Sequence, residues 1–323
     1  MMLKYAAQRI LLMLVTLTII VLMCFILIRM LPINIPSTEG ERYEDIMAKR
    51  EALGYGKPYL VQFGIFVKGI FTRWDWGISE RLAPAIPVAE LFADKLPATM
   101  IVNLFSIILS IPIGISLGIW AALKKNKITD HVISTVTMLA ISVPSFVYAF
   151  IVQYLFCYSP GNFPFQVAFD DGVFTPRALM SMIPPVLSLS FGVIAGFTRV
   201  TRAELTEVLT SEFMLLARTK GLTRTQATVR HALKNCMVVI LPAIFGEFIG
   251  IMSGSLIIES MFGIPGIGGM YLDSIKSSTG GGPDTPVFML LTVFYTFISL
   301  FAGIVVDISY GFIDPRIRMG SRK

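Results

Sequence analysis

The sequence predicts an all-α membrane protein with six transmembrane helices. Six strongly apolar regions alternate with polar loops, and each is long enough for the roughly 20 residues that a helix needs to cross a bilayer. The composition agrees, because 54% of the residues are hydrophobic and only 15% are charged, whereas soluble domains carry about 25% charged residues. Helices are the expected form, since backbone groups in lipid must be hydrogen-bonded within the segment.

The six regions follow one another along the whole chain. The first has 19 uncharged residues between Arg9 and Arg29. It exceeds the core of a signal peptide, about 7–15 residues, and no Ala-x-Ala site follows, so we expect it to remain as the first span. The others lie between Lys95 and Lys124 (28 residues), His131 and Asp170 (38, broken by Pro160-Gly161), Arg177 and Arg199 (21), Lys234 and Asp273 (apolar except for Glu247 and Glu259), and Asp284 and Asp307 (22).

Basic residues gather on one side of this arrangement. With the N-terminus in the cytoplasm, the cytoplasmic ends and loops hold 16 Lys and Arg, whereas the two short outer loops hold only Arg177 and Lys276. The long outer segment carries nearly balanced charges, and long segments translocate largely regardless of charge. Both termini are therefore predicted to be cytoplasmic. This topology also accounts for the net charge of +6, and we expect no nucleic-acid partner.

The predicted organisation has three parts. Residues 1–31 form the cytoplasmic N-terminus and first transmembrane helix, residues 32–95 an extracytoplasmic insert, and residues 96–323 a core of five transmembrane helices with a cytoplasmic loop over 202–235. Within the insert, helices are predicted over 43–53 and 59–71 from the spacing of their apolar residues. The pair Trp74 and Trp76 that follows is interpreted either as an interfacial anchor or as a contact surface for a soluble partner.

Small residues and prolines recur in the spans. Glycines have GxxxG spacing at Gly114–Gly118, Gly192–Gly196, Gly246–Gly250 and Gly250–Gly254. Because such pairs let helix backbones approach closely, they predict a tightly packed bundle. Prolines that should bend or interrupt helices are Pro112, Pro144, Pro184, Pro185 and Pro242. Kinked helices suit a gated pathway, although they also occur in static bundles.

The polar segment 202–235, between the fourth and fifth spans, is patterned for two helices joined by a sharp turn. Ser211 can cap a short helix, and Gly221 is a natural stop after it. Thr223 followed by Gln226 forms a capping box for a second helix that runs into the fifth span. The pattern fits a helix on the membrane surface or a docking element for a cytoplasmic partner.

The sequence contains little that indicates catalysis. It lacks the G-x-x-x-x-G-K-[ST] motif, so the chain cannot use ATP through a P-loop of its own, and it lacks H-E-x-x-H. His131 and His231 both fall in predicted cytoplasmic loops. Cys24, Cys157 and Cys236 form no CxxC pair and are interpreted as small apolar residues. No catalytic, cofactor-binding or metal-binding residue is predicted.

Three carboxylates fall in or near the spans. Glu259 and Asp307 lie near predicted helix ends and are interpreted as residues of the membrane interface, whereas Glu247 lies deeper and could line a path or bond to a neighbouring helix. Intramembrane charge is typical of ion-coupled transport. An autonomous ion-coupled secondary transporter is therefore one of the functions that the sequence leaves open. A membrane scaffold or receptor is a third class.

Several collinear motifs carry a family resemblance. The loop reads Glu212-Phe-Met-Leu-Leu-Ala-Arg-Thr-Lys-Gly221-Leu-Thr and then Arg230-His-Ala-Leu-Lys-Asn235. Further motifs are Gln8-Arg9-Ile10, Arg29-Met30-Leu31-Pro32, Leu53-Gly54-Tyr55-Gly56-Lys57-Pro58, Leu96-Pro97-Ala98-Thr99, Ser142-Val143-Pro144-Ser145-Phe146, the run from Glu259 to Gly268, and Asp314-Pro315-Arg316-Ile317-Arg318. Together they resemble binding-protein-dependent ABC importer permeases, most closely the dipeptide/oligopeptide branch, and the loop resembles that family's EAA loop.

The loop departs from the general EAA pattern, which is Glu-Ala-Ala, three residues, Gly, nine residues and Ile-x-Leu-Pro. Counted from Gly221, Leu215-Leu216-Ala217 replaces Glu-Ala-Ala and His231-Ala232-Leu233-Lys234 replaces Ile-x-Leu-Pro. Only Ala217, Gly221 and Leu233 match, so no charged Glu contact is carried over.

The resemblance implies a permease subunit that forms half of a translocation pathway, for di- or oligopeptides, in a bacterial or archaeal cell membrane. Its implied partners are a second homologous permease, two cytoplasmic ATPase subunits and an extracytoplasmic substrate-binding protein, besides membrane lipid. A coupling helix over 211–221 would seat in a groove of the ATPase. The candidate ATPase-coupling residues are Glu212, Ala217, Arg218, Lys220, Gly221 and Leu233.

Overall fold

The computed structural model describes residues 2–31, 54, 56–159, 161–169, 172–276 and 283–313, together with the isolated positions Glu44, Ala48 and Glu51. Most of the helix expected over 43–53, the break at Pro160 and the motif Asp314–Arg318 lie outside the described residues. Within the described ranges the regular structure is helical, apart from one antiparallel bridge between Ile78 and Pro87.

The predicted spans correspond to long apolar helices. Among the described residues, five helices are long and apolar enough to cross a membrane, and a sixth crossing results if two helices joined at a sharp bend count as one span. The five are α1 (Met2–Met30), α4 (Val88–Leu123), α7 (Pro176–Leu209), α10 (Leu233–Gly250, continuing a helix that begins at Arg224) and α13 (Thr285–Ile313). The predicted all-α membrane class is confirmed.

The bend lies in the third predicted span, between α5 (Ile128–Ser142) and α6 (Ser145–Val152), which meet at 100°. Val143 is extended there (φ −84°, ψ 127°), because the ring of Pro144 disfavours a helical conformation in the residue before it. α6 then continues as a π-helical turn, η1 (Gln153–Tyr158). The other four prolines expected to disturb helices lie inside continuous ones.

α4 and α7 form the most extensive helix contact among the described residues. They run in the same direction, because Gly114 lies against Phe197 and Gly118, one turn later, against Thr201. A Cβ on Gly114 would lie 2.8 Å from the Cβ of Phe197, and one on Gly118 would lie 2.6 Å from the Cβ of Thr201. The Thr198 hydroxyl also donates to the carbonyl oxygen of Gly114, at 3.2 Å. The close packing predicted from this GxxxG pair is confirmed.

The other glycine pairs behave differently. A Cβ on Gly192, Gly196 or Gly250 would meet nothing within 4 Å. One on Gly246 would meet the side chain of Val306 on α13 at 3.3 Å, and one on Gly254 would meet the side chain of Thr99 on α4 at 2.6 Å. The prediction of close helix packing is therefore wrong for Gly192 and Gly196 within this chain. Their open helix face becomes important for the site described below.

The fifth apolar region folds back after α10. The chain turns at residues 251–254 and forms two short helices, α11 (Leu256–Met261) and α12 (Ile267–Ile275). Glu259 on α11 is 2% exposed, so its interpretation as an interface residue is wrong. It is an internal anchor instead.

The buried Glu259 carboxylate joins three elements. It accepts hydrogen bonds from the backbone N–H groups of Gly268 (2.8 Å) and Gly269 (3.4 Å) in the first turn of α12 and from the Thr99 hydroxyl of α4 (3.0 Å). The same hydroxyl accepts a bond from the N–H of Ile267, at 2.9 Å. Because first-turn N–H groups have no partner within a helix, this carboxylate caps α12 and fixes it to α4.

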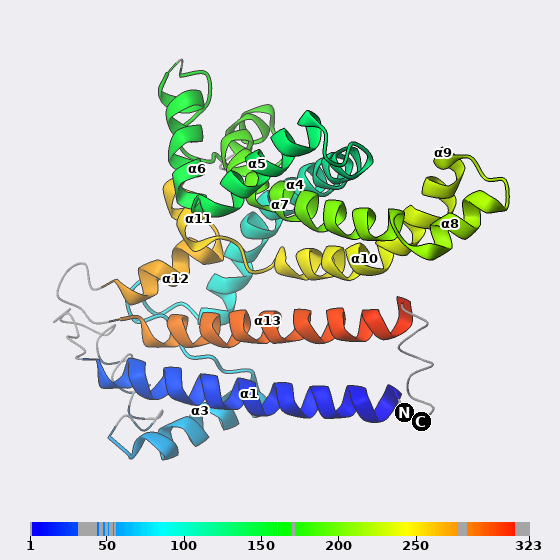
Figure 1. Cartoon of the computed structure of the whole chain (residues 1–323). Helices are drawn as coiled ribbons and strands as arrows, with labels where there is room; N and C mark the ends of the chain where they lie inside the picture. Colours follow the sequence, from blue (N-terminus) through cyan, green and yellow to red (C-terminus); the bar gives the residue numbers. More distant parts are fainter. Residues whose placement is uncertain are drawn as a thin grey trace.

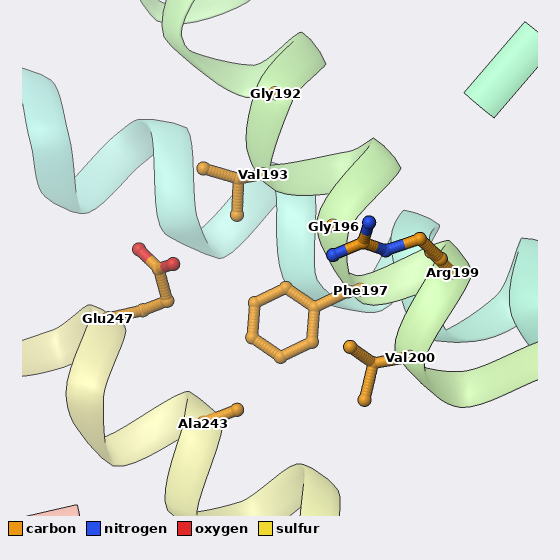
Figure 2. Close-up of a pocket in the computed structure, with 8 residues that line it drawn as sticks. All are labelled: Gly192, Val193, Gly196, Phe197, Arg199, Val200, Ala243 and Glu247. Carbon is orange, nitrogen blue, oxygen red and sulfur yellow. The ribbon is translucent and has the colours of Figure 1, made fainter. Parts of the chain in front are cut away.

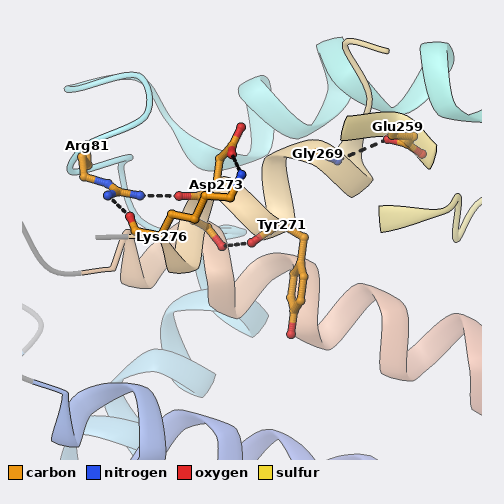
Figure 3. Close-up of polar contacts among 7 residues, drawn as sticks. Arg81, Glu259, Gly269, Tyr271, Asp273 and Lys276 are labelled. Atoms are coloured by element: carbon orange, nitrogen blue, oxygen red, sulfur yellow. Dashed lines mark hydrogen bonds and ion pairs between the residues drawn. The ribbon is translucent and has the colours of Figure 1, made fainter. Parts of the chain in front are cut away.

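The insert is tied to this end of the bundle. As Figure 3 shows, the Arg81 guanidinium donates to the main-chain carbonyl oxygens of Asp273 and Lys276, at the end of α12. The buried Asp284 carboxylate accepts from the Ser79 hydroxyl at 2.6 Å and from the N–H of Arg81 at 2.9 Å. The 79–82 turn is thereby held against both α12 and the start of α13.

The helix predicted over 59–71 is confirmed as α3 (Tyr59–Arg73), which lies along the C-terminal half of α1 (Figure 1). Phe63 and Phe66 of α3 pack on Phe25 of α1, with ring centroids 5.5 and 5.6 Å from it. Trp76 packs edge-on against Phe66, whereas Trp74 stays largely exposed. The two tryptophans thus differ: Trp74 is exposed, whereas Trp76 is partly buried.

α1 and α13 lie side by side and antiparallel (Figure 1). Arg9 and Asp307 form an ion pair with a nitrogen–oxygen distance of 3.0 Å, and both side chains are partly exposed. The pair brings the start of α1 next to the late part of α13, as expected if both termini lie on one side of the membrane.

Candidate functional site

One end of the bundle collects the polar elements. In Figure 1, α8 (Glu212–Thr219) and α9 (Arg224–Ala227) project at the end of the bundle where α1 begins and α13 ends. A second connection, between α4 and α5, belongs to this end, because Asp130 near the start of α5 binds Arg202 on α7. The elements predicted to be cytoplasmic are therefore together.

The first helix of the predicted loop ends as the sequence indicates. Gly221 has φ +90°, a left-handed conformation that glycine adopts without steric cost. Its N–H bonds to the Arg218 carbonyl at 3.0 Å, and the N–H of Leu222 bonds to the Ala217 carbonyl at 3.4 Å. These two bonds form a Schellman motif, which satisfies carbonyls that would otherwise be unpaired. Gly221 is confirmed as the helix stop.

The start of this helix differs in detail. Ser211 occupies the N-cap position, but its hydroxyl makes no capping bond and donates instead to the carbonyl of Val208, at 2.5 Å. The predicted side-chain cap is therefore wrong, although the helix boundary is right.

The second helix begins with the predicted capping box. The Thr223 hydroxyl accepts from the N–H of Gln226 at 3.3 Å, and the Gln226 side chain accepts from the N–H of Thr223 at 3.1 Å. From Arg224 the chain runs as one helix to Gly250, through a π-helical turn, η2 (Thr228–Ala232). The second helix of the loop is therefore continuous with the fifth span.

The predicted coupling residues divide between two faces of this element. Glu212, Arg218, Lys220 and Gly221 are exposed. Ala217 is 7% exposed and belongs to an apolar cluster with Met214, Ala227, Ala232 and Cys236, and half-buried Leu233 packs against the same cluster. Ala217 and Leu233 therefore position α8 within the chain and do not lie on its outer face.

Two further residues belong to the outer face. Leu215 and Leu216 are 61% and 56% exposed, although they lie next to buried Met214 and Ala217. A hollow of about 460 Å³ beside them is lined by Leu215, Arg218, Thr219, Leu222, Thr223 and Arg224. The signal was present in the sequence, because Met214 and Ala217 inside a short amphipathic helix require Leu215 and Leu216 to face outward.

A second hollow, of about 270 Å³, lies between α7 and α10. Figure 2 shows Glu247 of α10 on one side of it and Val193 and Phe197 of α7 on the other, with Arg199 farther along α7. Gly192 and Gly196 form the part of the wall that has no side chains. The sequence marked Glu247 as a deep carboxylate but gave no partner for it.

The fold thus defines a multi-pass helical membrane protein with a two-helix polar element at one end. Residues 2–112 match the model of the N-terminal part of the binding-protein-dependent transport system membrane component. Residues 114–319 match the model of the binding-protein-dependent transport system inner membrane component. The chain belongs to this family of ABC importer permeases.

Named relatives cover the whole chain. The dipeptide transport system permease protein DppB of Lactococcus lactis subsp. cremoris (strain MG1363) is 33% identical over 318 residues, which are 98% of this chain and 100% of the relative. The oligopeptide transport system permease protein OppB of Haemophilus influenzae is 30% identical over 319 residues, again 98% and 100%. A crystal structure of an amino acid ABC transporter with histidines has a TM-score of 0.51, at 19% identity, over 68% of this chain and 92% of that one. This last likeness supports the fold.

The chain is therefore a membrane-spanning permease subunit of a binding-protein-dependent importer. It is a transport component and not an enzyme, because importers of this family hydrolyse ATP on separate subunits. The family works with ATPase and substrate-binding partners in the inner membrane of bacteria. The importer function is thus confirmed over the alternative of an autonomous ion-coupled transporter.

Proposed function

We propose that the chain imports di- or oligopeptides as half of a pathway whose other half is a second, homologous permease. Two cytoplasmic ATPase subunits drive the movement, and an extracytoplasmic binding protein delivers the peptide. The relatives support this proposal, because both are named for dipeptide or oligopeptide transport and align along nearly the full chain.

The outer face of α8 is the proposed ATPase contact. Leu215 and Leu216 present apolar surface, and Arg218 and Lys220 add positive charge beside it. An exposed apolar pair at a polar end of the molecule is typical of a protein contact. Burying one leucine in such a contact contributes about 1.5–3 kcal/mol. The exposed pair is the single observation on which the coupling site depends.

The proposed orientation places this face in the cytoplasm. Lys124, Lys125 and Lys127 follow α4, Arg218 lies on α8, and Lys220 directly follows α8. The ion pair of Asp130 with Arg202 joins the α4–α5 connection to α7, the helix that leads into α8. Positive charge in short loops favours the cytoplasmic side. The insert and α12 then face the compartment from which the binding protein delivers substrate.

The test uses the whole transporter reconstituted in vesicles, with ATP enclosed and the binding protein outside. Labelled dialanine should accumulate only with ATP, and the double variant Leu215→Asp, Leu216→Asp should lose most uptake while the second permease still co-purifies. The matched control is Leu60→Asp, an equally exposed leucine on α3. Unchanged uptake in the double variant would remove the coupling assignment. Uptake by the permease without ATPase, driven by a proton gradient, would remove the proposed function.

A further inference from the structure

The hollow between α7 and α10 contains a carboxylate without a partner. Among the residues that the structure describes, the side chain of Glu247 makes neither a hydrogen bond nor an ion pair. The hollow around it is lined by apolar side chains and bare helix backbone and, farther along α7, by Arg199, which forms no ion pair with Glu247. A charge in a membrane span is expensive to hold unless something pairs with it. A cationic group from outside the chain is therefore the expected complement.

Glycines make room for that group. Gly192 and Gly196 face the hollow, and a Cβ at either position would meet nothing within 4 Å. The GxxxG pair on α4, Gly114 and Gly118, is different, because a Cβ added to either glycine would lie within 3 Å of α7 atoms. The two glycines on α7 thus keep space open, where the pair on α4 closes it.

A second charge stands at the far end of the hollow. Arg199 is exposed, and it likewise has no ion pair in the described part of the chain. The α7 wall of the hollow runs from Gly192 to Arg199, seven residues or about 10 Å along a helix. An extended di- or tripeptide has a similar length, at about 3.5 Å per residue. The hollow therefore matches a short peptide in length and presents one acidic and one basic side chain to its two charged ends.

We propose that Glu247 binds the terminal ammonium group of the peptide during its passage, with Arg199 placed to receive the carboxylate end. The proposal rests on the peptide import proposed above and names the permease residues that contact the cargo. Gly192 and Gly196 admit the peptide backbone next to α7. The second permease would cover the open side of the hollow.

The test compares Glu247→Gln with the wild-type chain in the complete reconstituted transporter. Uptake of dialanine and of N-acetyl-dialanine is measured with the same binding protein, so that a change in their ratio belongs to the permease. We expect about a tenfold loss of dialanine uptake efficiency in Glu247→Gln, the effect of losing one hydrogen bond to a charged group. The ratio of dialanine uptake to N-acetyl-dialanine uptake should also fall in this variant. Glu247→Asp should retain part of both, and Glu207→Gln, an exposed carboxylate of α7, should change neither.

Each other outcome has a distinct meaning. If wild-type vesicles take up no peptide, the proposed function fails before the hollow is tested. If Glu247→Gln keeps both the rate and the preference, the inference is overturned. If Glu247→Gln no longer co-purifies with the second permease, the carboxylate is a subunit contact and the inference is also overturned. A preference that depends on phosphatidylethanolamine in the vesicles would assign the ammonium to lipid and overturn it as well.

A space-filling variant gives an independent measurement. Gly196→Leu should block uptake by occupying the hollow, while the thermal unfolding temperature of the purified chain stays close to that of wild type, because the new Cβ has nothing within 4 Å and the rest of the side chain extends into the hollow. Gly303→Leu is the matched control, since Gly303 lies in the span α13, is exposed and also has nothing within 4 Å. Full uptake by Gly196→Leu would contradict a cargo passage at this place.

Discussion

Arg202 on α7 holds Asp130 at the start of α5 through two hydrogen bonds, from Nε at 2.5 Å and from a terminal guanidinium nitrogen at 2.9 Å. Asp130 is 1% exposed and also accepts from the N–H of Asn126, at 2.9 Å. The carboxylate thus joins the α4–α5 connection to the helix that leads into α8. The polar end of the bundle is braced by this contact before any partner binds.

Removing the brace should destabilise the chain. Arg202→Ala leaves a buried carboxylate with weaker partners, and we expect it to lower the free energy of unfolding by about 2 kcal/mol, within the range for hydrogen bonds to charged groups. The measurement is the thermal unfolding temperature of the purified chain in detergent. Lys234→Ala, an exposed cation at the same end, is the control and should leave that temperature unchanged. Equal temperatures for both variants would contradict the brace.

Gly221 should tolerate neither alanine nor proline. A Cβ there meets nothing within 4 Å, so the penalty comes from φ +90°, which costs about 1–2 kcal/mol for an L-residue. Proline, which fixes φ near −65°, also removes the N–H that bonds to Arg218 and should be worse. ATP-dependent uptake should fall from wild type to Gly221→Ala to Gly221→Pro, with membrane insertion intact. Gly56→Ala, an exposed glycine with equal space, should behave as wild type, and a proline variant as active as the alanine variant would refute this ordering.

A bulky residue at position 217 should push α8 away from the apolar cluster on which it packs. Ala217 is buried against the base of α10, and overpacking of such a site costs about 1–3 kcal/mol. Ala217→Phe should therefore reduce ATP-dependent uptake and also increase proteolytic cleavage in the loop. The comparison variant Leu216→Phe changes an exposed position of the same helix and should leave the cleavage rate unaltered. Identical cleavage patterns in the two variants would show that Ala217 does not position α8.

The anchor at Glu259 makes a sharp prediction about two nearby glycines. A Cβ on Gly266 would lie 2.3 Å from a carboxylate oxygen of Glu259, whereas one on Gly269 would have its nearest neighbour at 3.9 Å. Gly266→Ala should therefore greatly lower the yield of folded chain in size-exclusion chromatography, and Gly269→Ala should not. Similar yields of the two variants would mean that Glu259 is not held as the structure places it.

The sequence predicted the elements that depend on local patterns. The lengths of the uncharged segments predicted the membrane spans. Gly221, Thr223 and Gln226 predicted the turn and the helix cap in the loop, because these signals act within a few residues. The extended conformation at Val143 follows from its neighbour in the same way. The 100° angle that results is a tertiary property that no local rule supplies.

Residues that act over long sequence distances were missed. Thr99 and Glu259 are 160 positions apart. The local sequence around Glu259 therefore predicts a residue of the membrane interface and does not indicate its buried partner on α4. The four GxxxG pairs read alike in the sequence, yet only the surroundings decide whether Gly118 closes a helix contact or Gly196 leaves a hollow. Ser211 marked a boundary correctly, but the direction of its hydroxyl depends on the preceding helix.

Arg81 grips the end of α12 through the main-chain carbonyls of Asp273 and Lys276 and not through their side chains. Every amino acid supplies that oxygen. Homologous proteins can therefore have other residues at positions 273 and 276 and still form these two hydrogen bonds, provided that position 81 remains arginine. Homologous sequences should vary more at positions 273 and 276 than at position 81.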